Sequence, residues 1–112
     1  MPESEARAPY TVHAIAFQAG ELWVAQCLEV DIVSFTGRGL RELVEVLANQ
    51  LHAAAILAFA TRGQLFDRYR AAPAKWWEAL SKAEGEPWRS VAQRPYVDLR
   101  VYPQRARRGD EE

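Results

Sequence analysis

Apolar and polar residues alternate in four short stretches of the chain, the pattern typical of β-strands. In residues 10–17 both alternating sets carry large side chains, which predicts a strand covered on each face. A loop that contains Gly20 joins this strand to a second one at 22–27, so the two form a predicted hairpin. The β-branched run 31–35 predicts a third strand. The alternation in 96–102 predicts a fourth, half-exposed strand.

After Gly39 the apolar period changes from two to that of a helix. Gly39 is the expected N-cap, Glu42 supplies the acidic residue of the first turn, and Gly63 is the expected stop. The predicted helix of about 23 residues would be about 35 Å long. Its apolar stripe consists of Leu40, Leu43, Val44, Leu47, Leu51, Ala54, Ala55 and Ala58.

This helix carries a second apolar set beside the main stripe, and such a surface must be covered by something. The set comprises Val46, Ala53 and Leu57, widened near the helix end by Ile56 and Phe59. The cover is either a second predicted helix, from Pro73 to Glu84, or another subunit. The element order β-β-β-α-α-β indicates an α+β fold with a sheet packed against a long helix.

The length of 112 residues suits one domain, which we place at residues 10–102. The polar ends, residues 1–9 and 103–112, are expected to be disordered. The net charge of -1 favours neither nucleic acid nor a membrane surface. A single cysteine, no secretory signal and no apolar run long enough to span a bilayer predict a cytoplasmic protein.

The residues able to do chemistry are few and scattered. His13 and His52 lack nearby ligands at metal-site spacing, and Cys27 lacks a local base, so we expect neither a metal site nor a cofactor. Glu29 and Asp31 lie two residues apart and could hold a divalent ion, but a third acidic partner is not evident, so a polar loop between two strands is the preferred interpretation. No catalytic residue is expected, since Ser34 also lacks the G-x-S-x-G setting of a nucleophile.

Tryptophans and basic residues gather in the second half of the chain. Trp76, Trp77 and Trp88 could stack bases beside a basic groove, but tryptophans on an amphipathic helix more often pack on a core or a partner. The basic residues that would contact nucleic acid are Arg62, Arg68, Arg70 and Lys75, together with the arginines of the tail.

The segment from the second strand to the long helix resembles the HicB-like antitoxin family. Members carry a hairpin, a segment similar to C-L-E-L-D-I-V-S, a glycine turn and a long helix. The matching residues here are Cys27, Leu28, Glu29, Asp31, Ile32, Val33 and Ser34, followed by Gly37, Arg38 and Gly39, with Glu42 in the first helical turn. The aspartate and threonine usual in that turn are replaced, and the likeness extends over residues 10–60.

The resemblance implies a core similar to a reduced RNase H or double-stranded-RNA-binding fold that has lost any nuclease site. It also implies a partner, the small mRNA-cleaving toxin HicA, which such antitoxins block. Many relatives carry a C-terminal helix-turn-helix or ribbon-helix-helix domain. Only ten residues follow Tyr102 here, so DNA binding is not expected.

Three hypotheses follow. The first is a non-enzymatic HicB-like protein that forms homodimers or larger homo-oligomers and binds a small basic toxin. Its predicted interface is Val46, Ala53, Ile56, Leu57 and Phe59, with Trp76 and Trp77. The second is a stand-alone nucleic-acid-binding module, and an orphan HicB-like domain without a toxin is a variant of the first. The third is a nuclease relic with metal at Glu29 and Asp31.

Overall fold

A computed structural model of the chain describes residues 10–61, 69–91 and 96–104. The elements are the strands β1 (Tyr10–Ala19), β2 (Leu22–Cys27), β3 (Val33–Thr36) and β4 (Val97–Pro103), and the helices α2 (Leu40–Ala60) and α4 (Ala74–Ser81). Their order, β-β-β-α-α-β, confirms the predicted α+β class. The expected stop at Gly63 and the ends 1–9 and 105–112 lie outside the described residues.

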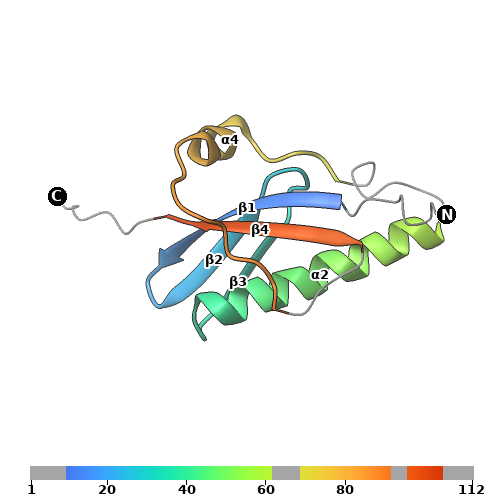
Figure 1. Cartoon of the computed structure of the whole chain (residues 1–112), viewed down its shortest axis with the longest axis horizontal. Helices are drawn as coiled ribbons and strands as arrows, with labels where there is room; N and C mark the ends of the chain where they lie inside the picture. The colour runs from blue at the N-terminus through green and yellow to red at the C-terminus, as the bar shows by residue number, and fades with distance from the viewer. Residues whose placement is uncertain (1–9, 62–68, 92–95, 105–112) are drawn as a thin grey trace.

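The four strands form one mixed sheet in the order β3-β2-β1-β4 (Figure 1). β1 and β2 form the predicted antiparallel hairpin, and Gly20 has the positive φ of 65° that its turn requires. β4 pairs with β1 in parallel, which is possible because the whole helical region separates the two strands in sequence. β4 extends to Pro103, and the Gln104 N–H donates to the Ala16 carbonyl, so the ordered chain continues past the boundary expected at residue 102.

α2 packs across one face of the sheet and builds the main core with it. The residues of β1 that face the helix are small, and the predicted stripe of α2 fills the space above them. The core comprises Val12, Ala14, Ala16, Ala25, Cys27, Leu43, Val44, Leu47, Leu51, Val97, Leu99 and Val101, with neighbouring alanines of the helix. α2 begins after Gly39, which adopts φ 100° and ψ 170°, a conformation almost restricted to glycine.

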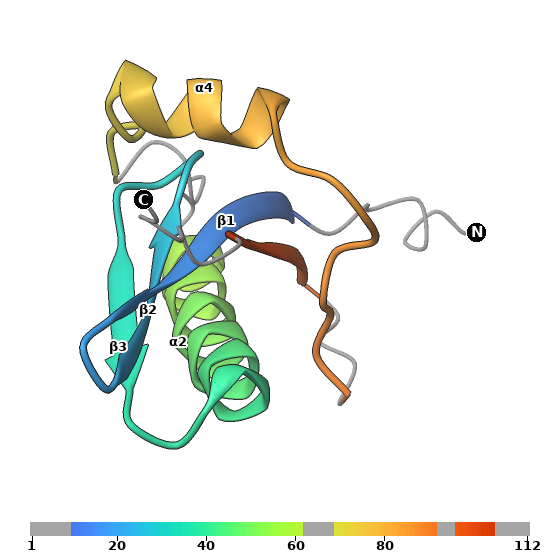
Figure 2. The ribbon, with the colours of Figure 1, turned by 90° about the vertical axis from the view of Figure 1, so that its left-hand side faces the viewer.

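α4 lies on the opposite face of the sheet from α2 (Figures 1 and 2). It packs against β1, where Trp76 stacks on Phe17 with ring centroids 5.5 Å apart. The second set of β1 side chains, which includes the buried Ile15, therefore supports α4 rather than α2. This arrangement explains why both faces of β1 carry bulk. It also shows that α4 does not cover the second apolar set of α2.

Candidate interaction surfaces

The outward half of α2 carries several exposed apolar side chains that the described chain does not cover. Ile56, Leu57 and Phe59 are 45%, 56% and 52% exposed, and the neighbouring alanines Ala53 and Ala60 are exposed as well. Val46 lies seven residues before Ala53 and is half-buried. We call the set Val46, Ala53, Ile56, Leu57 and Ala60 the outer stripe of α2.

Phe59 lies beside the outer stripe rather than in it. Its ring packs on Tyr96 at a centroid distance of 5.9 Å, and the His52 ring packs on the same tyrosine at 5.8 Å. His52 therefore contacts an aromatic neighbour. Its Nδ1 atom is buried without a hydrogen-bond partner in the described chain.

The outer stripe is electrically neutral. From Val46 to Ala60 the sequence contains no Asp, Glu, Lys or Arg. Among the described residues α2 is the one helix long and apolar enough to cross a membrane by length and composition, yet 39% of its most apolar window is buried against the sheet. A helix that packs its main stripe in a core and still exposes this much apolar surface has the composition of an interface.

The tryptophans of α4 pack within the fold and lie apart from the outer stripe. Trp76 is half-buried on Phe17, and the Trp77 Nε1–H donates to the Ala72 carbonyl at 3.1 Å while the side chain stays 37% exposed. Trp76 and Trp77 were predicted to share one interface with the apolar residues of α2. The sheet instead lies between α2 and α4, because α4 packs against β1 on the face opposite α2 (Figure 2).

The structure adds little support for the predicted nucleic-acid contacts. Arg62 and Arg68 lie outside the described residues. Arg70 is exposed, and Lys75 lies 5.3 Å from the Trp76 ring centroid. Trp88, the third tryptophan considered for base stacking, forms a backbone bridge with Val101 at the edge of β4 and carries the Arg41 guanidinium over its ring at 4.7 Å. The rings of Trp76 and Trp88 therefore already make contacts within the fold.

Glu29 and Asp31 lie in the loop between β2 and β3 and have different partners. The Glu29 carboxylate accepts the His13 backbone N–H at 2.8 Å, and its second oxygen lies 2.6 Å from His13 Nδ1. Asp31 accepts a hydrogen bond from the Gln26 side chain at 2.7 Å. Within the described residues no three His, Cys, Asp or Glu side chains form a group that could hold a metal ion.

Cys27 is fully buried at the end of β2. Burial, reinforced by the negative charge of Glu29, raises the pKa of its thiol well above the ordinary range. The thiol is therefore a small apolar core group at neutral pH rather than a nucleophile.

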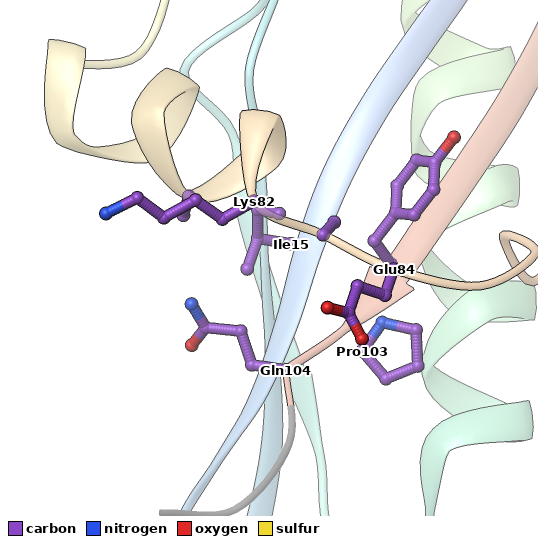
Figure 3. Close-up of a pocket in the computed structure, with 8 residues that line it drawn as sticks. Ile15, Lys82, Glu84, Pro103 and Gln104 are labelled. Carbon is purple, nitrogen blue, oxygen red and sulfur yellow. The ribbon is translucent and has the colours of Figure 1, made fainter.

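A shallow hollow of about 570 Å³ lies between the end of α4 and the neighbouring strands β1 and β4 (Figure 3). Ile15 and Pro103 lie in its apolar part, while Lys82, Glu84 and Gln104 carry its polar groups. Lys82 already pairs with Glu78 at 3.5 Å and is largely exposed. The hollow is open to solvent and lacks a convergent set of polar groups, so it does not resemble a preformed small-molecule site.

The position of β3 at the edge of the sheet could not be predicted from the sequence. Val33 and Phe35 are 50% and 64% exposed on the face of the sheet opposite α2, and Leu22 at the start of β2 is 40% exposed. Alternation identified β3 as a strand, but only the strand order shows that one side of it has no neighbour in the sheet. Within the described residues, exposed apolar side chains thus occur both on α2 and at β3.

No family model, curated protein or solved structure matches this chain.

Proposed function

We propose that this chain is a non-enzymatic, HicB-like interaction protein that self-associates and binds a small basic partner of the mRNA-cleaving toxin type. The observation that carries the self-association is the outer stripe of α2, where Ile56 and Leu57 remain about half exposed on a helix whose opposite side is fully packed. A surface of this kind is typical of proteins that act by contact with other proteins.

The arrangement around the HicB-like segment adds support. Three antiparallel strands lead through Gly39 into one long helix, the order that the resemblance implies. The acidic residues of the segment hold the loop together instead of converging: Glu29 anchors His13, and Asp31 accepts from Gln26. These contacts favour a scaffold role for the two carboxylates over the nuclease-relic hypothesis.

The test begins with purification of the tagged chain from the cell that encodes it, with bound protein identified by mass spectrometry and nucleic acid by its absorbance. We expect a stoichiometric, small and basic protein. Expression of that partner alone should cleave mRNA and arrest growth, and co-expression of this chain should restore growth.

Two outcomes contradict the toxin-binding part of the proposal. One is a captured protein whose expression leaves mRNA intact. The other is recovery of stoichiometric nucleic acid whose binding weakens steeply as salt is raised, which is the signature of phosphate contacts. A variant with Asp31→Asn serves as a control for metal chemistry, because loss of any cleavage activity in that variant would revive the nuclease hypothesis.

A further inference from the structure

We propose that the outer stripe of α2 is a homodimer seam, in which the helix packs antiparallel against α2 of a second copy around a two-fold axis near Ile56 and Leu57. The proposal rests on the self-association included in the proposed function. It adds the surface, the relative orientation of the helices and the residues at the axis.

The spacing of the outer stripe suits this arrangement. Ala53 and Ala60 lie seven residues apart, so they follow each other along one side of the helix, with Leu57 between them. About an axis between Ile56 and Leu57, Ala53 of each copy opposes Ala60 of the other, and Ile56 opposes Leu57. The paired alanines allow the helix backbones to approach closely, while the larger side chains fill the space at the axis. A two-fold interface requires such self-complementarity.

The absence of formal charge on this surface favours a second copy over a basic protein or a nucleic acid. The stretch from Val46 to Ala60 carries no formal charge. Two copies therefore meet without like-charge repulsion, whereas a basic protein or a nucleic acid gains no electrostatic attraction there. A helix that binds a membrane surface typically carries Lys or Arg along the border of its apolar face, and this stretch has none.

The available area fits a modest dimer. Half-exposed side chains of the size of Ile56, Leu57 and Phe59 each offer on the order of 100 Å². With the exposed alanines and the neighbouring Asn49 and Gln50, the outward surface of α2 contributes roughly 500 Å² per chain. A pair would then bury about 1,000 Å², close to the lower limit of specific interfaces. We therefore expect a dimer that dissociates measurably on dilution.

Site-directed cross-linking tests this geometry. The native Cys27 is buried, so a thiol introduced by Leu57→Cys is the reactive one. Near a two-fold axis the two introduced thiols come within disulfide distance. The matched control is Phe35→Cys, at a similarly exposed apolar residue on the other face of the sheet. We expect mild oxidation to yield at least tenfold more covalent dimer for Leu57→Cys than for Phe35→Cys.

Light scattering across a dilution series provides the second readout. We expect the unmodified chain to be dimeric at high concentration, and Leu57→Glu to raise the dissociation constant at least tenfold while Phe35→Glu changes it little. Circular dichroism establishes that each variant is folded, and only folded variants are compared.

Three results overturn the inference. A dimer that persists in Leu57→Glu and is lost in Phe35→Glu places self-association elsewhere and leaves the proposed function standing. A monomer at every concentration removes self-association from the proposed function too, whatever partner the purification finds. Binding of the unmodified chain to phosphatidylcholine vesicles that is lost in Leu57→Glu assigns the stripe to lipid.

Discussion

Leu51 and Leu57 offer a matched pair of substitutions that tests how α2 sits on the sheet. Both lie in the same helix, but Leu51 is fully buried in the core and Leu57 is 56% exposed. Leu51→Ala removes buried methyl groups and leaves a cavity between helix and sheet, which should lower the free energy of unfolding by about 3–4 kcal/mol. Leu57→Ala loses less than half of a full transfer energy and opens no cavity, so we expect a loss below about 1 kcal/mol.

The assay is urea unfolding followed by circular dichroism at several protein concentrations. Leu51→Ala should lower the free energy of unfolding by the same amount at every concentration, with an unchanged dependence on urea. At low concentration Leu57→Ala should have nearly the same free energy of unfolding as the unmodified chain. At high concentration its free energy of unfolding should be lower, because only the proposed dimer would bury this side chain. An equal loss for both variants at the lowest concentration would refute the placement of α2.

The remaining predictions concern the turn, the loops and the thiol. Gly39→Ala should lower the free energy of unfolding, measured with urea, by about 2 kcal/mol. The space around Gly39 is open, with nothing within 4 Å of an added Cβ, so the expected loss comes from the backbone at φ 100°, a conformation that residues with a side chain rarely adopt. Glu29→Ala should lower the free energy of unfolding by about 1–3 kcal/mol in the same assay, because it leaves the His13 N–H unpaired. An unchanged free energy of unfolding would show that this contact does not stabilise the fold. Burial alone would raise the pKa of Glu45, but hydrogen bonds from the Val91 N–H, Ser90 and Arg41 outweigh it and lower that pKa. The stability from Glu45 is therefore present above the pKa of the unfolded chain and lost as pH falls through the lowered folded pKa, and Glu45→Gln should flatten the acid limb of the stability profile. The Cys27 thiol should react with a thiol reagent only at the rate of unfolding, and rapid labelling of the native chain would contradict its burial.

The sequence predicted the elements well because their patterns are local. The start of β1, the bounds of β2, the start of α2 at Leu40 and the buried set of β4 follow from period and turn residues alone, whereas β1 runs two residues beyond its predicted end. The bulk on both faces of β1 also pointed to cover on each side, and the structure supplies it with α2 on one face and α4 on the other.

The placement of α4 could not be predicted in the same way. Its amphipathic pattern says that one side of the helix is buried, but it does not say against which face of the sheet. That choice depends on contacts between residues distant in sequence, such as the packing of Trp76 on Phe17. The local pattern therefore could not show that Trp76 and Trp77 lie on the other face of the sheet from the apolar residues of α2.

The candidate chemistry shows a similar limit. Glu29 and Asp31 would share a face if they stood in a strand, but β3 begins only at Val33, and the loop turns the two carboxylates to separate partners. The contact between Glu29 and His13 joins residues sixteen positions apart. Only the pairing of β1 with β2 brings them together, and that register is not visible in the local spacing.

The apolar residues of the outer stripe require an explanation other than folding. Ile56 and Leu57 are about half exposed on a helix whose main stripe already fills the core. Glu, Lys or Gln at these two positions would remain in solvent, and each has a higher intrinsic helix propensity than Ile. The fold would thus tolerate polar residues here at little cost. A single exposed apolar side chain would mean little, but a neutral set of them along one side of α2 supports the proposed contact with a second copy.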